Sequence, residues 1–300
     1  MQTVVIYGGS GFIGTLLSRA LLREGYRVVV ADMKEPRVSG VAYHPVDVMR
    51  SLVKHDNLRN PYAVVNLVGK NIVGRFTEAH RHDIYRTRVN ATRHIVRMFE
   101  DREYQPSVFV NASAVGLYGD RGGEVLNEDS PPGSLYLSRV VEDWETEARI
   151  AESFHVRTVV LRQGIVLGPG GILGMLLPIY RLGLGGPIGN GEQWFSWIHY
   201  EDVVGLYIRA LSDARMQGAY NATAHPVKQK EFSLLLARTL HRPHLFRVPK
   251  WALRMRYGDF ADELCASQRV IPERLSKESI HLNHNDIAHA LWSMNLRGKK

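Results

Sequence analysis

Among its 300 residues the chain has one cysteine, Cys265, which excludes an intramolecular disulfide framework and a metal site built from several cysteines. It also has no run of about 18 apolar residues, and no basic segment precedes the first apolar run. We therefore expect neither a membrane-spanning helix nor a signal peptide. The single cysteine favours a reducing, cytoplasmic setting. His199 and Asp202 lie close in sequence but lack further ligands, so no metal site is predicted.

The chain also lacks any tract of one charge. Its formal net charge is +8, but lysines and arginines are scattered among acidic residues. This pattern is typical of a solvated surface that attracts an anionic cofactor or substrate, so neither a nucleic acid nor a membrane is expected as a partner. With 45% hydrophobic residues, the composition is ample for a globular core.

Glycine is concentrated near the N-terminus, in the run VVIYGGSGFIGTLLSRALL. An apolar strand at residues 4–7 leads into glycines, and apolar residues then recur at helical spacing. Such a turn brings the backbone close to a pyrophosphate at the start of a helix. The residues that we predict to contact a dinucleotide here are Gly8, Gly11, Phe12, Ile13 and Gly14.

A second apolar run, residues 26–31, ends at Asp32, at the distance from the glycines that a dinucleotide-binding fold requires. A carboxylate there accepts the ribose 2′-hydroxyl and repels a 2′-phosphate, which favours NAD over NADP. Lys34 weakens this inference, so NADP stays open. The alternative is that Asp32 only begins a surface turn.

Strand and helix patterns alternate along the next 130 residues. Further strands are predicted at 41–46, 63–68, 107–112 and 156–161, and helices at 78–99 and 142–153. Runs of this kind are typical of a doubly wound parallel sheet, the Rossmann fold of the α/β class. Cofactors bind at the carboxyl ends of such strands. This adds four predicted cofactor contacts, Asp47, Val48, Leu67 and Gly69.

The remaining chain divides into two parts. A glycine-rich but apolar segment, 168–197, is predicted to be a substrate-facing crevice loop with one embedded helix. From about residue 226 the pattern becomes mostly helical, with helices expected at 232–240, 251–256 and 262–266. We therefore expect a cofactor-binding domain at 1–225 and a small, mostly helical substrate domain at 226–300.

Several segments resemble one known family. NLVGKNI, LRQGIVLGPGGILGMLLPIYRLGLGGPIGNGEQWFSWIHYEDVV, VPKWALR and CASQRVIPERL are similar to the uncharacterised epimerase branch of the extended short-chain dehydrogenase/reductases, the NAD-dependent epimerase/dehydratase group. The resemblance implies an NAD(P)-dependent oxidoreductase or epimerase that acts on a nucleotide sugar or another hydroxylated small molecule by hydride transfer. It also implies a possible homodimer.

Typical members use a serine after the fifth strand and a Tyr-x-x-x-Lys pair on the next helix. The resemblance places Ser113 at the serine and Tyr136 at the tyrosine, but Val140 stands where lysine is expected. An unassisted phenol is a poor base at neutral pH. The positive ring of an oxidised cofactor, Arg139 or Lys70 would be needed to assist it; otherwise Tyr136 only packs.

Two further residues are predicted to face a substrate. Arg162 ends a strand and is a candidate for binding an anionic group, and Trp194 is a candidate for stacking on a ring, the alternative being a buried anchor. Two functions remain open. The chain is an enzyme, or it is a dinucleotide-binding sensor or assembly factor that has lost catalysis, which Val140 favours.

Overall fold

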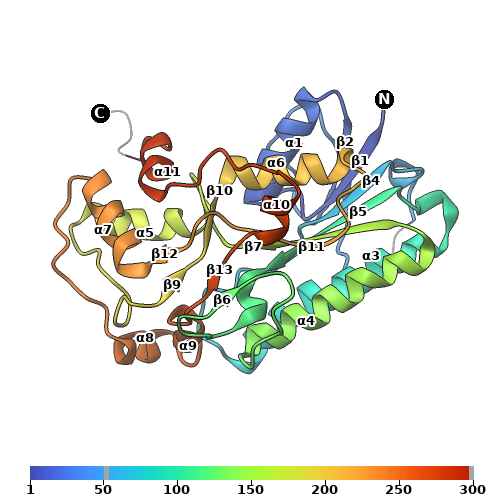
Figure 1. Ribbon diagram of the computed structural model, residues 1–300. Coiled ribbons are helices and arrows are strands. Elements are labelled where there is room, and N and C mark those ends of the chain that lie inside the picture. Colours follow the sequence, from blue (N-terminus) through green and yellow to red (C-terminus); the bar gives the residue numbers. More distant parts are fainter. Residues whose placement is uncertain (51–53, 297–300) are drawn as a thin grey trace.

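A computed structural model describes residues 1–50 and 54–296, and its centre is a seven-stranded, fully parallel sheet (Figure 1). In spatial order the strands are β11 (Gly218–Ala222), β7 (Arg157–Gln163), β5 (Val108–Ala114), β4 (Ala63–Asn66), β1 (Thr3–Tyr7), β2 (Arg27–Asp32) and β3 (Ala42–Pro45). The chain starts in the middle of the sheet, at β1, and winds outward in both directions. The predicted doubly wound Rossmann fold is confirmed.

Helices cover both faces of this sheet. One face carries α1 (Phe12–Arg23) and α6 (Tyr200–Ser212). The other carries α2 (Glu78–Tyr85), a π-helical turn (Arg86–Asn90), α3 (Ala91–Arg97) and α4 (Tyr136–Arg149). Strand side chains alternate between the two cores: Val4 and Ile6 pack on the α1 side, whereas Val5 and Tyr7 pack on the α3 side. Both cores are apolar, as the near-continuous valine runs require.

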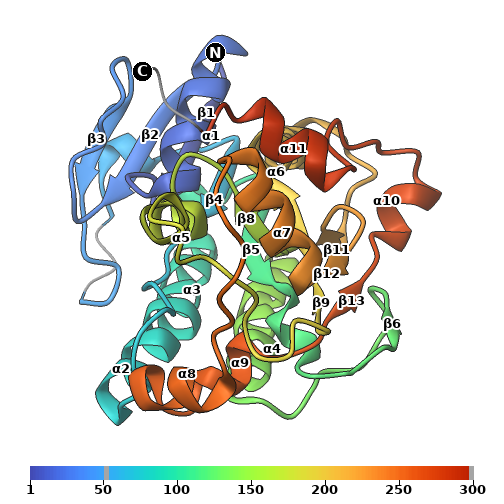
Figure 2. The same cartoon turned by 90° about the vertical axis from the view of Figure 1, so that its left-hand side faces the viewer.

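A smaller layer covers the carboxyl ends of the strands (Figure 2). Its helices are α5 (Gly171–Arg181), α7 (Gln229–Thr239), α8 (Lys250–Tyr257), α9 (Phe260–Leu264), α10 (Glu273–Lys277) and α11 (Ile287–Ser293). Its short strands pair as β8 (Ile165–Leu167) with β10 (Trp197–His199), β9 (Trp194–Phe195) with β12 (Val227–Lys228), and β6 (Val125–Leu126) with β13 (Arg269–Val270). Single 3-10 turns lie at Asp56–Leu58, Met98–Glu100, Arg102–Tyr104, Val115–Tyr118 and Ile150–Phe154.

The C-terminal segment contacts the earlier part of the chain through two strand pairs and through two side chains in the core. The pairs β9–β12 and β6–β13 join it to earlier parts of the chain, and Leu275 and Ile280 complete the core on the α1 side. The division at residue 226 stays our proposal, and residues 297–300 of the predicted second domain lie outside the described residues. None of the described helices is long and apolar enough to span a membrane.

The six strands expected from the sequence are all present, each within one or two residues at its start. The seventh, β11, was not predicted. Helix α4 begins six residues earlier than the predicted residue 142, because its first two turns bury Leu137, Val140 and Val141. The helix embedded in the crevice loop is confirmed as α5.

Candidate functional site

A cavity of about 820 Å³ opens at the carboxyl ends of β1, β4, β5 and β7. The glycine turn and the residues after β4 form one end. Helix α4 forms a wall, and the crevice loop with α8 and α9 closes the other end. This size is typical of a ligand site, and the position is where open α/β sheets bind cofactors.

The glycine turn is shaped for close approach of a ligand. Gly8 has φ +74°, and a Cβ there would lie 2.8 Å from the backbone of Leu67 and Val68; a Cβ at Gly14 would lie 2.5 Å from Gly9. Helix α1 follows with Gly11 at its N-cap and no side-chain cap, so its first N–H groups are available to an anion. A dinucleotide pyrophosphate fits this cradle.

Most of the residues predicted to hold a cofactor line this cavity. They are Gly8, Gly11, Phe12, Ile13, Gly14, Leu67 and Gly69. Phe12 has a second function, because a Cβ at Gly168 or Gly170 would lie within 2.7 Å of its ring. The ring therefore supports the start of the crevice loop against the glycine turn.

The other three predicted cofactor residues lie outside the cavity lining. Asp32 ends β2, where its Oδ2 accepts a hydrogen bond from Ser10 N at 3.0 Å, so its carboxylate is fixed beside the glycine turn. Asp47 Oδ1 accepts from Met49 N, and Val48 is buried in the core on the α3 side. Ribose recognition by Asp32 and adenine contact by Asp47 and Val48 stay predictions.

Ser113 ends β5 at the cavity wall, and its hydroxyl is already engaged. Its Oγ donates to Glu145 Oε1 at 2.6 Å, and both residues are buried. Hydrogen bonding to a carboxylate leaves the lone pairs of Oγ as the groups that face a ligand. Ser113 is therefore suited to accept a hydrogen bond from a substrate hydroxyl. The sequence did not point to Glu145.

Arg162 is not among the described residues that line the cavity, and its contact with a substrate stays a prediction. Its Nε and second terminal nitrogen donate to the two oxygens of Glu145 at 2.8 and 2.9 Å, and its remaining nitrogen donates to Tyr118 Oη and Glu128 O. The side chain is buried. Four of the five N–H groups of the guanidinium are thus engaged, so Arg162 holds Glu145, and through it Ser113, in place.

Tyr136 is not among the described residues that line the cavity, and its role as a candidate base stays a prediction. Its hydroxyl donates to Arg81 O at 2.7 Å, and burial raises its pKa. Of the groups proposed to assist it, Lys70 pairs with Asp83 at 2.5 Å and Arg139 is exposed; neither lines the cavity. The face of α4 toward the cavity carries Leu137, Val140, Val141 and Trp144.

The one carboxylate among the described cavity-lining residues comes from α9. Glu263 Oε1 accepts a hydrogen bond from Leu137 N, in the first turn of α4, at 2.9 Å. Burial raises the pKa of Glu263 to about 7, so the group exchanges a proton near neutral pH. Glu263 could not be found from the sequence, because it lies 126 positions from Leu137, its hydrogen-bond partner.

Arg88 supplies a cation to the cavity from the π-helical turn, an element that is frequent at functional sites. Its guanidinium donates to Lys70 O at 3.1 Å and lies over the ring of Trp144. Among the described residues it has no carboxylate partner, and burial lowers its pKa to about 10, so it stays charged at neutral pH. This position, against Gly69, favours an anionic ligand group.

Trp194 lines the far end of the cavity. Lys228 Nζ and the Arg269 guanidinium lie 4.2 and 4.5 Å from its ring centroid, and its backbone N–H donates to Ser267 Oγ. The ring of Trp194 therefore already makes cation–π contacts with two side chains. Stacking of a substrate on Trp194 stays a prediction.

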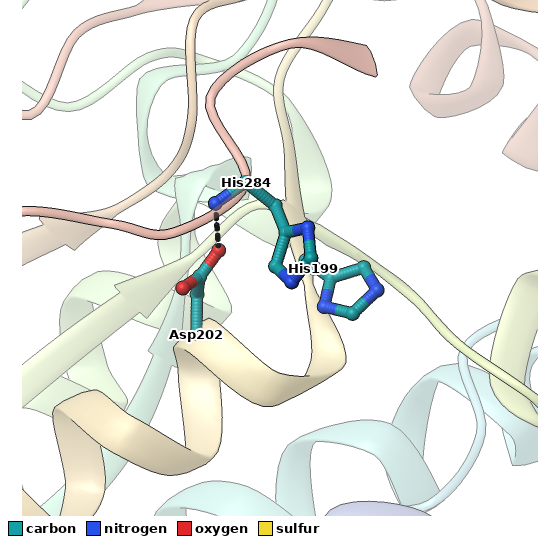
Figure 3. A group of neighbouring side chains, drawn as sticks. All are labelled: His199, Asp202 and His284. Atoms are coloured by element: carbon teal, nitrogen blue, oxygen red, sulfur yellow. Dashed lines mark hydrogen bonds between the residues drawn. The ribbon is translucent and has the colours of Figure 1, made fainter. Parts of the chain in front are cut away.

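A histidine group joins α6 to the C-terminal segment (Figure 3). The rings of His199 and His284 are in contact, with centroids 3.7 Å apart and planes tilted by 33°, and Asp202 accepts the backbone N–H groups of Asn283 and His284. The ligand atoms of His199, Asp202 and His284 all lie within 4.8 Å of one another. Because the carboxylate is already hydrogen-bonded to the C-terminal segment and the two rings pack on each other, this group acts as a polar joint between α6 and that segment.

The comparisons with known proteins agree with this geometry. Residues 4–223 match the model of the NAD dependent epimerase/dehydratase family, and residues 248–293 match a domain of unknown function, DUF1731. The chain is 32% identical to the epimerase family protein YfhF of Bacillus subtilis over 97% of each chain. It is 34% identical to the chloroplastic SDR39U1 homolog of Arabidopsis thaliana, covering 97% of this chain and 86% of that one.

The crystal structure of human epimerase family protein SDR39U1 with NADPH superposes on the chain with a TM-score of 0.87. The two are 30% identical, over 98% of this chain and 99% of that one. The family match covers more than half of the chain, and the superposition with the human protein covers nearly its whole length. The chain therefore belongs to the NAD-dependent epimerase/dehydratase family.

Proposed function

We propose that the protein is an NAD(P)-dependent oxidoreductase or epimerase that transfers hydride between the nicotinamide and a carbon bearing a hydroxyl or carbonyl group. The observation that carries this proposal is the cavity: a glycine cradle, a polarised serine and a carboxyl that titrates near neutral pH line one space. Nucleotide sugars and other small hydroxylated molecules are the substrates to test.

In this proposal the cofactor, when bound, donates or accepts the hydride, and side chains of the protein transfer the proton. Ser113 Oγ accepts a hydrogen bond from a second hydroxyl of the substrate, next to the reacting one, which orients the substrate, while Glu145 and Arg162 fix the serine. Glu263 takes the proton of an alcohol as it is oxidised, or gives one to a carbonyl oxygen as it is reduced. A pKa near 7 suits both directions at neutral pH.

Two observations favour different dinucleotides. Asp32, held beside the glycine turn, favours the free ribose of NAD. The human relative was crystallised with NADPH, which favours the phosphorylated form. Replacing Asp32 with asparagine removes the negative charge, so we expect the affinity for NADP to rise relative to NAD. Calorimetric titration of both forms measures this ratio.

The proposal is tested by following nicotinamide absorbance with panels of hydroxylated and carbonyl compounds, nucleotide sugars among them. Once a substrate is found, Glu263→Gln should lower turnover about 100-fold without changing cofactor affinity, and should remove the inflection near pH 7. Glu231→Gln, an exposed carboxylate on α7, is the matched control.

The second candidate function is a dinucleotide-binding sensor or assembly factor. It is favoured by the apolar face that α4 turns toward the cavity, at Leu137, Val140 and Val141. Tight dinucleotide binding without turnover of any compound in the panel would favour the sensor over the enzyme.

A further inference from the structure

The surface around the cavity mouth carries most of the exposed apolar bulk. Fourteen large apolar side chains are exposed among the described residues, and eight of them lie within residues 175–184 and 245–255. They are Met175, Ile179, Leu182, Leu184, Leu245, Phe246, Trp251 and Met255. We call this surface the docking face. Contiguous exposed apolar surface of this kind marks an interaction site.

The two segments of the docking face are neighbours in space. A Cβ at Gly183 would lie 3.5 Å from Pro243, and a β-bridge joins Ile188 to Val248. Figure 2 shows α5, α8 and the connection between α7 and α8 on the side that faces the viewer. Leu184 also lines the cavity, so the cavity opens within this face.

Helix α8 exposes apolar residues where a surface helix normally exposes polar ones. Trp251 and Met255 are four residues apart, hence neighbours on one side of the helix, and they are 67% and 73% exposed. Leu253, in contrast, is buried and lines the cavity. Trp251 and Met255 therefore contribute little to packing within the described part of the chain.

The same region is strongly basic. No acidic residue occurs between Glu231 and Asp259. That stretch contains six exposed cations, Arg238, Arg242, Arg247, Lys250, Arg254 and Arg256. Lys250 and Arg254 share Asp262, at 2.7 and 2.9 Å, whereas Arg242 and Arg256 pair with no carboxylate among the described residues. The docking face thus combines exposed Trp, Phe and Leu with a surplus of positive charge.

We propose that the docking face binds the surface of an anionic lipid bilayer, with Leu245, Phe246 and Trp251 in the interfacial region and the cations at the headgroups. Exposed Trp, Phe and Leu together with Lys and Arg is the composition of segments that lie on such surfaces. A second copy of this chain is a poorer occupant, because a two-fold contact would bring the cation cluster against itself.

Met175, Ile179 and Leu184 line the cavity, but Leu245, Phe246, Trp251 and Met255 do not, so the docking does not depend on the proposed function. It departs from the expectation that no membrane is a partner, which rested on the lack of a spanning segment and of a basic tract. Because the cavity opens within the docking face, an apolar compound dissolved in the bilayer would meet the cavity mouth directly.

The test is flotation of the full chain with vesicles of phosphatidylcholine alone and of phosphatidylcholine mixed with phosphatidylglycerol. We expect binding to the anionic vesicles only, weakened by salt. Arg242→Gln with Arg247→Gln should lower this binding on the order of tenfold. Arg19→Gln with Arg23→Gln, which removes equal charge from α1, should leave it unchanged.

The apolar contribution is tested by Trp251→Ser with Met255→Ser, against Trp292→Ser on α11, where the tryptophan is 73% exposed but lies outside the docking face. We expect only the first variant to lose binding, with thermal unfolding unchanged in both. No binding to anionic vesicles, equal loss in both variants, or a dimer in sedimentation that the α8 variant abolishes would each overturn the proposal.

Discussion

At the scale of single residues, Glu263 couples the cavity to pH. Its pKa is raised from an ordinary value near 4.5 to about 7, so between these values the folded state holds a proton that the unfolded state releases. Stability is then lost as the pH rises through this window, by about 2 kcal/mol with solvent screening at the cavity. Urea unfolding from pH 5 to 8 should show this loss in the native chain and not in Glu263→Gln. A parallel decline in both proteins would contradict the assignment.

The buried pair of Arg162 and Glu145 makes a second prediction at this scale. Arg162→Met leaves the Glu145 carboxylate buried with two of its four side-chain hydrogen bonds removed, and should destabilise the fold by about 3 kcal/mol. Arg149→Met is the matched control, because Arg149 donates to the same carboxylate at 3.2 Å but is half exposed, and should cost less than about 1 kcal/mol. Equal effects in urea unfolding would show that Arg162 is not the structural partner of Glu145.

At the scale of the element, α4 carries both the tyrosine and the valine that stands where a lysine is expected. Restoring the missing lysine with Val140→Lys does not rebuild a tyrosine–lysine pair, because the Tyr136 hydroxyl is bonded to Arg81 O, outside the cavity. Val140 is 1% exposed and packs with Phe76, Ile84 and Phe260, so the lysine would bury a charge. We expect lower thermal stability and no gain in turnover at any pH. A gain near neutral pH would show that the tyrosine reaches the substrate.

The elements also show which features the sequence could predict. Strands β1 and β2 are short apolar runs next to glycines or charges, and the glycine turn between β1 and α1 follows a known backbone requirement. Strand β11, GAYNA, has no apolar run and was missed. The side-chain direction of Tyr136 depends on its hydrogen bond to Arg81 O, 55 residues away. That of Arg162 depends on its pairing with Glu145, 17 residues away. No local pattern contains that information.

At the scale of the whole molecule, the histidine joint links α6 to the C-terminal segment. Burial and the neighbouring His284 lower the pKa of His199 to about 4, although Glu201 acts in the opposite direction and His289 also faces the group. A histidine with a lowered pKa stabilises the fold above its unfolded value near 6.5, and this stability is lost as the pH falls toward 4. Hydrogen exchange should therefore show residues 283–293 opening at pH 5 before the central sheet. In His199→Phe the interval between the opening of residues 283–293 and that of the sheet should be smaller. Simultaneous opening of both regions in the native protein would contradict this role of His199.

We expect the glycine turn to hold a nicotinamide dinucleotide. Calorimetric titration of NAD, NADH, NADP and NADPH into the cofactor-free protein and into Gly8→Ala tests this expectation. A Cβ at residue 8 would lie 2.8 Å from the backbone of Leu67, at φ +74°. We therefore expect at least one dinucleotide to bind the native protein, and its affinity to fall at least about tenfold in the variant. Binding of none of the four dinucleotides, or equal binding by both proteins, would contradict the assignment of the glycine turn as the dinucleotide site.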